Sequence, residues 1–226
     1  MHQQFRIDLM APVVALALGG VSGLASAAGF ALIEQSASGM GNAYAGAAAI
    51  AEDASTIFFN PAGLTKLEGR QFAVAGHVVA VSAEFSNNGS STAPTGIATL
   101  GGNGGNAGAT AFIPNAYFSM PYGERAVLGI GINAPFGLVT EYDSNWVGRF
   151  QGIKSDIMTV NLNPTIAYRI NDAVSVGFGI SYQQFDAELT NKVSGAVFGF
   201  PGTEFNAVLK ADDDGFGWNA GVLIQA

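Results

Sequence analysis

The chain has 226 residues, with 31 glycines, no cysteine and a formal net charge of −8. Charged residues make up 12% and apolar residues 49% of it, whereas a soluble domain usually carries about a quarter charged residues. The absence of cysteine excludes a disulfide scaffold and any thiolate metal site, and the negative charge argues against nucleic acid as a partner.

Residues 1–27 have the features of a secretory signal peptide. A short apolar run, Ala11 to Leu18, is followed by small residues that end at Ala27, which fits the A-x-A pattern for cleavage before Ala28. The run is too short to span a bilayer as a helix, which needs roughly 20 apolar residues. A buried N-terminal helix is the alternative, but the glycines that follow the run would weaken it. The sequence therefore predicts an exported protein.

Residues 28–69 form a segment rich in Gly, Ala and Ser that has no strand-like alternation. Within it, Asn60 is suited to cap a short helix, because its side chain can accept a hydrogen bond from a free backbone N–H. Pro61 then occupies the first helical position, where its missing N–H costs nothing. We expect this segment to be a compact, mostly helical hatch.

From residue 70 onward, apolar side chains alternate with polar or small ones. In the segment 156–170, for example, Val160 and Leu162 alternate with Asn161 and Asn163, and side chains on a strand change face with period two. This alternation suits a transmembrane barrel or a soluble β-sandwich whose apolar face points inward. Six strands are expected at 70–86, 111–121, 126–135, 155–170, 173–190 and 215–226.

The connections between these strands favour the barrel. Outer-membrane barrels have short turns on the periplasmic side and longer loops outside. Tyr122 and Tyr168 would then lie near the periplasmic ends, where an aromatic girdle belongs. The expected long loops are 87–110, 137–154 and 191–214, and the expected tight turns are 122–125 and 171–172.

Several stretches together resemble the FadL family of outer-membrane transporters. The matching stretches are residues 28–30, 34–46, 51–54, 60–62, 113–115, 137–142 and 215–221. The resemblance implies an all-β fold: the N-terminal part of a transmembrane antiparallel β-barrel, with a small helical hatch plugging its lumen. It also implies that residues 70–226 are the first strands of a longer barrel in the outer membrane of a Gram-negative bacterium.

The resemblance further implies passive uptake of long-chain fatty acids or similar hydrophobic molecules, which leave sideways into the membrane. Aromatic or aliphatic hydrocarbons are an alternative ligand on the same fold, and a surface adhesin or structural barrel is an alternative function. The implied partners are the hydrophobic ligand, outer-membrane lipid and the barrel-assembly machinery. No cofactor, no nucleic acid and no enzymatic activity is implied, and the complete protein is expected to be a monomer.

Two candidate sites lie in the hatch. Phe30 is either a core aromatic of the plug or the mobile residue that occupies the ligand site, as the resemblance implies. Asn60, with Pro61, is either a plain helix cap or a hatch contact that lines the lateral exit.

Two further candidates lie beyond the hatch. Pro135, Phe136 and Gly137 either simply end the third strand or form the kink that opens the barrel wall in the family. Phe198 and Phe200 form an apolar cluster in a loop, which either lines a groove that captures ligand or packs against a helix of the loop itself.

The sequence offers little for an enzyme or a metal centre. His77 is the one histidine left after cleavage, and no companion motif accompanies it. The acidic run 212–214 lacks the loop spacing of a calcium site. We therefore predict no catalytic residue and no metal ligand.

Overall fold

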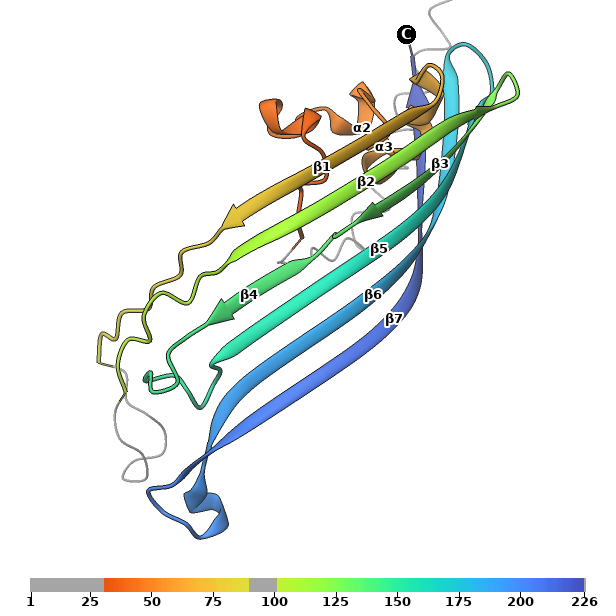
Figure 1. The fold of residues 1–226 in the computed structure, drawn as a ribbon. Coiled ribbons are helices and arrows are strands. Elements are labelled where there is room, and N and C mark those ends of the chain that lie inside the picture. The colour runs from red at the N-terminus through yellow and green to blue at the C-terminus, as the bar shows by residue number, and fades with distance from the viewer. Residues whose placement is uncertain (1–30, 90–100, 226) are drawn as a thin grey trace, which may run out of the picture. The chain divides into compact units, whose positions relative to one another are not determined.

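A computed structural model describes residues 31–89 and 101–225. No helix in these ranges is long and apolar enough to cross a bilayer. Among the described residues, four short helices precede the strands and one lies near a hairpin tip (Figure 1): η1 Ser38–Asn42, α2 Ala47–Ile50, α3 Thr56–Phe59, η2 Pro61–Lys66 and η3 Gly195–Phe198. The strands are β1 Gln71–Ala80, β2 Thr110–Tyr122, β3 Ala126–Asn133, β4 Gly137–Glu141, β5 Lys154–Arg169, β6 Val174–Ser194 and β7 Glu204–Ile224.

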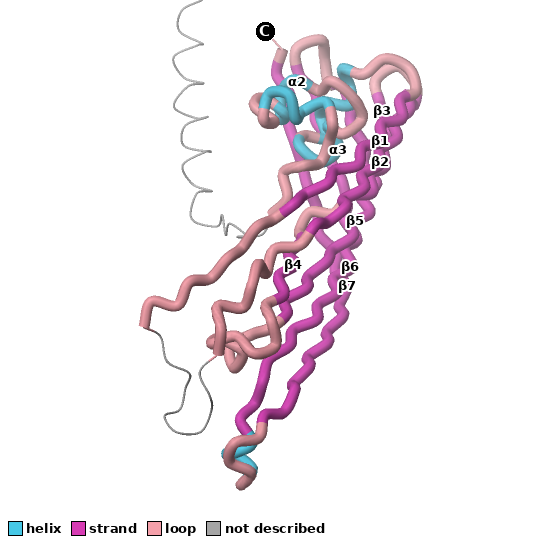
Figure 2. Tube along the Cα trace, turned by 60° about the vertical axis from the view of Figure 1, so that its left-hand side comes forward, coloured by secondary structure: helices cyan, strands magenta, loops and turns pink. Residues whose placement is uncertain are grey.

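The strands form one antiparallel sheet in the order β1-β2-β3-β5-β6-β7, and β4 pairs with β5 beyond the end of β3. The helices before β1 gather against one face of this sheet, near one end of the strands (Figure 2). We call this face the inner face, the opposite one the outer face, and residues 31–69 the hatch. The antiparallel sheet with a small helical plug agrees with the predicted fold class.

The two faces of the sheet have the reverse of a soluble protein's polarity. On β5, the inner residues Thr159 and Asn163 are 1% and 3% exposed. On the outer face, Ile166 is 46% exposed and Trp218 of β7 is 73% exposed. A sandwich would bury its apolar face, so this arrangement decides in favour of a membrane barrel wall.

The apolar part of the outer face has the height of a membrane. It runs over nine residues on β7, from Phe216 to Ile224, and over eleven on β5, from Met158 to Tyr168. A membrane-spanning β-strand needs about 9–11 residues. At the end of this band that is farther from the hatch, Tyr182 packs against Phe216, with ring centroids 5.2 Å apart. Aromatic pairs of this kind mark the membrane boundary in barrels.

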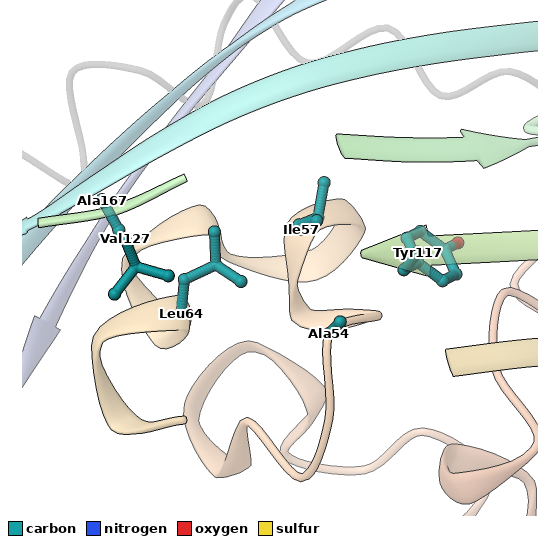
Figure 3. Packing of buried hydrophobic residues seen from close by; sticks show 6 residues of the cluster. All are labelled: Ala54, Ile57, Leu64, Tyr117, Val127 and Ala167. Atoms are coloured by element: carbon teal, nitrogen blue, oxygen red, sulfur yellow. The ribbon is translucent and has the colours of Figure 1, made fainter. Parts of the chain in front are cut away.

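The hatch and the wall share one small apolar core (Figure 3). Ile57 and Leu64 of the hatch are fully buried against inner-face residues of three strands. The cluster consists of Ala54, Ile57, Leu64, Tyr117, Val127 and Ala167. This packing fixes the second half of the hatch on the sheet.

The predicted third long loop, 191–214, is wrong. β6 continues to Ser194 and β7 begins at Glu204, with pairs such as Thr190 opposite Val208. The run Asp212–Asp214 therefore lies inside β7 and not in a loop. The hairpin extends beyond the apolar band, and the alternation changes phase there: Phe185, Ala187 and Leu189 are apolar but continue the inner face, which is polar or small within the band. A strand whose apolar face changes midway does not show one continuous period-two pattern.

Other predicted boundaries shift for local reasons. β1 ends at Ala80 instead of residue 86, and the expected loop 137–154 contains β4. The third strand stops at Asn133, before Pro135, which cannot donate a ladder hydrogen bond. The turn at 171–172 is wider than predicted, because Asn171 Oδ1 accepts hydrogen bonds from the backbone of residues 173 and 174.

Candidate functional site

The sheet is interrupted where β3 passes into β4. β3 pairs with β5 as far as Asn133 opposite Asn161, and β4 resumes with Gly137 opposite Met158. Three residues, 134–136, thus face two, which is a β-bulge and bends the strand. The Thr159 hydroxyl replaces the lost ladder: Oγ1 donates to the Phe136 carbonyl at 2.8 Å and accepts from its N–H at 2.9 Å.

The bend leaves an opening between β2 and β4, which we call the lateral window. β2 pairs with β3 only from Ala116 onward, opposite Ile132. The chain meets β4 again at a bridge between Gly108 and Thr140. Between these points, residues 109–115 and 133–139 have no pairing with each other in the described part of the chain.

An apolar groove of about 360 Å³ lies at the lateral window. Its walls come from β1 to β5 and from Leu32 of the hatch, and Asp156 is the one charged residue among those that line it. The apolar lining includes Val79, Phe112, Ile132, Phe136, Leu138 and Met158. We call this cavity the window groove.

The beginning of the hatch lies along the inner side of the lateral window. Leu32 donates its N–H to the Pro135 carbonyl at 2.9 Å, and Gln35 Nε2 donates to the Ala134 carbonyl at 3.0 Å. Ala31 forms a β-bridge with Phe136. Because buried backbone groups need partners, these contacts satisfy carbonyls that the bulge removed from the ladder.

Asn60 holds the hatch at a second place, against β7. Its Oδ1 accepts the N–H of Ala62 at 3.1 Å and caps η2, as the sequence predicts, with Pro61 at the first position. Its Nδ2 donates to the carbonyls of Ala48 at 2.7 Å and Val222 at 3.1 Å. The side chain is therefore both a cap and a link between hatch and wall.

Two glycines make room for this contact. Gly177 and Gly221 face each other across β6 and β7. A Cβ at Gly177 would lie 2.3 Å from the Ala62 nitrogen, and one at Gly221 would lie 2.0 Å from Asn60 Oδ1. Only glycine allows the hatch backbone to approach the wall so closely.

Polar inner-face residues add further contacts between the hatch and the wall near Gly177 and Gly221. We call this contact area the hatch seat. Asn219 Nδ2 donates to the Ile57 carbonyl at 3.1 Å, and Thr65 Oγ1 donates to Ser175 Oγ at 2.8 Å. Arg169 also donates to the Thr65 carbonyl. Sequence reasoning missed the strand residues Arg169, Ser175 and Asn219, although each is a polar residue between two apolar neighbours.

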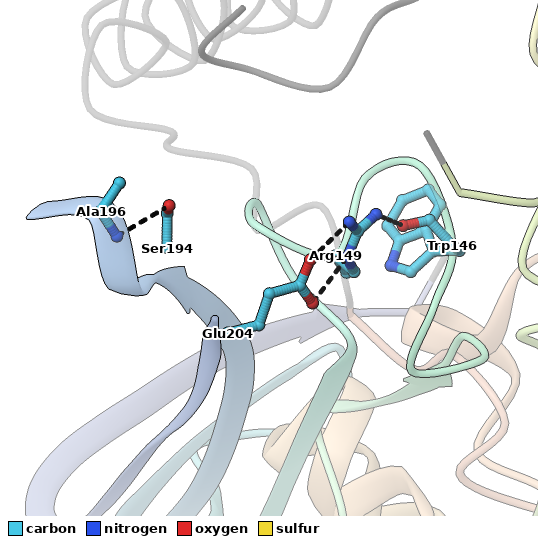
Figure 4. Close-up of polar contacts among 5 residues, drawn as sticks. All are labelled: Trp146, Arg149, Ser194, Ala196 and Glu204. Carbon is cyan, nitrogen blue, oxygen red and sulfur yellow. Dashed lines mark hydrogen bonds and ion pairs between the residues drawn. The ribbon is translucent and has the colours of Figure 1, made fainter. Parts of the chain in front are cut away.

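The loop that follows β4 is fixed by a buried cation (Figure 4). Arg149 Nη2 lies 2.6 Å from Glu204 Oε1 at the start of β7, and the arginine side chain is 3% exposed. Its guanidinium carbon also lies 4.7 Å from the centre of the Phe150 ring. Nearby, Trp146 stacks on Tyr142 with centroids 4.0 Å apart. These contacts connect the loop that follows β4 to the β6–β7 hairpin.

The predicted site residues fall in separate places. Pro135, Phe136 and Gly137 lie at the lateral window, and the latter two line the window groove. Asn60 and Pro61 lie on the β6–β7 side and are not among the lining residues.

The remaining predicted residues lie elsewhere. Phe198 and Phe200 are 62% and 59% exposed at the hairpin tip. Phe30 and the cleavage pair Ala27 and Ala28 lie outside the described residues. His77 is buried in β1. In residues 31–89 and 101–225 no three His, Cys, Asp or Glu side chains are grouped to hold a metal.

A sheet with an apolar outer face, a polar inner face and a helical plug defines a hatch-bearing membrane β-barrel wall. The family model described as "Outer membrane protein transport protein (OMPP1/FadL/TodX)" matches residues 18–226. The chain belongs to this family of outer-membrane proteins.

Relatives and solved structures agree with this assignment. Outer membrane protein P1 of Haemophilus influenzae is 34% identical over 258 residues, covering 99% of this chain and 55% of the relative. The long-chain fatty acid transport protein of Escherichia coli K12 is 33% identical over 250 residues, covering 100% and 54%. The chain thus spans about half the length of these curated relatives.

The structural comparison supports the same fold. A FadL homologue of Pseudomonas aeruginosa has a TM-score of 0.70 at 23% identity, covering 88% of this chain and 50% of that one. The P. putida toluene transporter TodX has a TM-score of 0.58 at 16% identity, covering 76% and 48%. The sheet and hatch described above are therefore the fold of this family.

Proposed function

We propose that the complete protein takes up long-chain fatty acids or similar hydrophobic molecules passively across the outer membrane. The ligand leaves the lumen sideways, through the lateral window. The observation that carries this proposal is the window groove, whose lining belongs to both faces of the wall.

The lining residues make the connection concrete. Phe112 and Met158 belong to the exposed outer face, at 68% and 55% exposure, and would contact lipid. Ile113 and Asn133 belong to the buried inner face, at 6% and 3% exposure. A groove bordered by residues of both kinds joins the luminal side of the wall to its membrane side.

The energetics favour such a route for an apolar ligand. Exposing hydrocarbon to water costs roughly 0.8 kcal/mol per CH₂ group. A ligand that passes from an apolar groove directly into the membrane never exposes its chain to periplasmic water. No input of chemical energy is then required, and no catalytic step takes part.

Aromatic or aliphatic hydrocarbons are the second candidate ligand, and one observation favours them. No Lys or Arg is among the residues that line the window groove, so nothing there pairs with a carboxylate. One solved neighbour is named as a toluene transporter. A purely structural barrel or adhesin would have no use for this groove.

The proposal includes the organisation of the chain. Residues 1–27 are a signal peptide, 28–69 the hatch and 70–226 the first strands of the barrel. The exposed apolar band contacts outer-membrane lipid, and the barrel-assembly machinery inserts the protein, which is a monomer when complete. Phe198 and Phe200 form part of an outer surface that captures ligand, and Phe30 occupies the ligand site before capture.

Filling the window groove tests the proposal. In the complete protein, Gly137→Phe places a ring in the groove, and its Cβ meets only Leu32 Cδ1 at 3.4 Å and the Ile157 carbonyl oxygen at 3.9 Å. Uptake of labelled oleate by cells should fall at least about tenfold if all ligand passes here, because one aromatic ring blocks a groove of this size. Outer-membrane abundance, measured by immunoblot, should remain unchanged.

Ala220→Phe is the matched control. Ala220 is exposed on the outer face of β7, far from the groove in the sheet order, and the substitution adds the same ring. Uptake should be normal in this variant. If the Gly137→Phe protein is present at normal abundance and still transports oleate normally, the window is not the exit.

A further inference from the structure

Four buried polar atoms of the described residues near the lateral window lack a hydrogen-bond partner: Gln35 Oε1, His77 Nε2, Asn115 Oδ1 and Asn161 Oδ1. The first three belong to the side of the window formed by β1, β2 and the hatch. Their residues are 0%, 5% and 2% exposed. A buried polar atom without a partner is costly, so each such atom in a native structure requires an explanation.

These atoms lie directly behind the window groove. Gln35 Nε2 donates to the carbonyls of Leu32 and Ala134, which both line the groove. Asn115 follows the lining residue Pro114, and its Nδ2 donates to the carbonyl of Glu34, the neighbour of Gln35.

His77 belongs to the same place. It lies opposite the lining residue Ile113 in the β1–β2 ladder. It is therefore a diagonal neighbour of Asn115 on the inner face, at a spacing of about 7–8 Å that aromatic and long side chains can span.

The hydrogen bonds that Gln35 and Asn115 already make show which atom of each amide remains free and whether that atom can donate or accept. The amide nitrogens of Gln35 and Asn115 face main-chain carbonyls, which can only accept. The free amide atoms are therefore the oxygens, which are acceptors. His77 Nε2 adds a third acceptor when its proton is on the other ring nitrogen.

We propose that Gln35, His77 and Asn115 form a polar subsite at the inner end of the window groove. It accepts a hydrogen bond from the head group of a neutral apolar molecule, either an alcohol or an un-ionised carboxylic acid. This inference rests on the proposed function, because it assigns the head-group chemistry of a ligand that passes through the lateral window.

The groove itself disfavours the ionised form. A carboxylate has no proton to donate to three acceptors, and burying its charge is unfavourable without a paired cation. Asp156 is the one charged residue that lines the groove, and it would repel a carboxylate. The apolar lining is left for the hydrocarbon tail.

Ligands that differ only in hydrogen-bond donation test the subsite. Dodecanol can donate one hydrogen bond, whereas methyl laurate has a similar chain and cannot donate. Binding of each to the purified complete protein in lipid nanodiscs would be measured by displacement of a fluorescent fatty-acid probe. Dodecanol should bind roughly fivefold more tightly than methyl laurate, the effect of one net hydrogen bond.

Two variants should remove this preference. His77→Leu loses no hydrogen bond that Nε2 makes in the structure, so the fold should survive it. Asn115→Leu is the second variant and removes the amide oxygen directly. Ser119→Ala is the matched control, because its Oγ is also buried without a partner on the inner face of β2, but Ser119 lies four residues beyond Asn115 and has no neighbour in β2 that lines the groove.

The outcomes separate this inference from the proposed function. Equal affinity for dodecanol and methyl laurate in the unaltered protein would overturn the subsite and point to a bound water at these atoms. A preference that survives both His77→Leu and Asn115→Leu would also overturn it. Failure of the lateral window itself appears differently, as normal uptake of either compound in Gly137→Phe.

Discussion

Asn60 shows how one side chain can fix the hatch at three points. Its oxygen caps η2, while its nitrogen donates to α2 and to the wall at Val222. It is 8% exposed, so a lost bond there is not replaced by water. A helix cap alone would need only the oxygen, which means that the amide is required for the link to the wall.

Substituting Asn60 distinguishes the cap from the link. Asn60→Ala removes all three hydrogen bonds, whereas Asn60→Ser keeps a good capping oxygen and loses the two donated bonds. Both variants should lower the stability of the folded protein by about 1–3 kcal/mol. Both should also reduce oleate uptake in cells beyond any loss of folded protein. Thermal unfolding on gels and uptake per unit of protein check this.

A plain cap predicts another pattern. Asn60→Ser would then restore both stability and uptake, and only the alanine variant would be affected. Normal uptake at normal abundance in both variants would remove Asn60 from the candidate site.

Among the elements, β6 and β7 provide the inner-face surface against which η2 packs. The glycine pair 177 and 221 and the polar residue Asn219 form the hatch seat, and the core residues Ile57 and Leu64 pack beside it. The beginning of the hatch has fewer buried residues, and Ile33 and Met40 are 52% and 59% exposed. The hatch therefore has a firmly held second half and a more exposed first half.

Gly177→Ala tests the hatch seat. The new Cβ would lie 2.3 Å from the Ala62 nitrogen, so the hatch must shift. Overpacking of this kind costs about 1–3 kcal/mol, and the urea midpoint of the complete protein should fall accordingly. Gly217→Ala is the control, since its Cβ meets only Ser181 Cβ at 3.8 Å. An unchanged midpoint in Gly177→Ala would mean that the hatch does not rest there.

The Arg149–Glu204 ion pair links two elements that are distant in the chain. The arginine side chain is 3% exposed but the glutamate side chain is 26% exposed, so solvent screens part of the interaction.

Arg149→Met should therefore destabilise the loop at residues 142–153 by about 1–2 kcal/mol. Limited proteolysis should cut this loop faster, and the double variant with Glu204→Gln should be no worse than Arg149→Met alone. Additive losses in the double variant would show that the pair is not coupled.

At the scale of the whole molecule, the polarity of the sheet is organised for a membrane. Apolar side chains face outward over a band of nine to eleven residues per strand, and polar ones face the hatch. Such a surface is stable only in lipid, because in water it would expose a large contiguous apolar area. The protein must therefore cross the inner membrane before it folds, and this is the step that the proposed signal peptide, residues 1–27, would serve.

Export predicts a defined mature end. Mass spectrometry of protein extracted from outer membranes should find Ala28 as the first residue, because cleavage follows the small residue Ala27. Changing Ala27→Arg should block cleavage and leave the precursor. Protein that starts at Met1 and is recovered from the cytosol in quantity would contradict the export argument.

The sequence by itself determined the class of the fold and the segments of the wall. Period-two alternation on β5 and β7 depends only on which residues face lipid, and lipid contact imposes apolar side chains at every second position. The Asn60 cap and the Pro61 start were also readable, because capping is a local interaction between neighbouring residues.

Only the tertiary structure decided which face of the sheet points outward, where the hairpin of β6 and β7 ends and where the wall opens. Alternation is the same for a sandwich and a barrel, and the loop lengths only favoured the barrel, whereas the burial of Asn163 and the exposure of Ile166 show directly that the apolar face points outward. In the β6–β7 extension the apolar positions, such as Phe185 and Leu189, lie on the inner face instead of the outer one, so the change of phase hides the continuation of the two strands. The lateral window and the hatch seat depend on contacts between residues far apart in the chain, such as Gln35 with Ala134 and Asn60 with Val222, and no local pattern encodes such pairs.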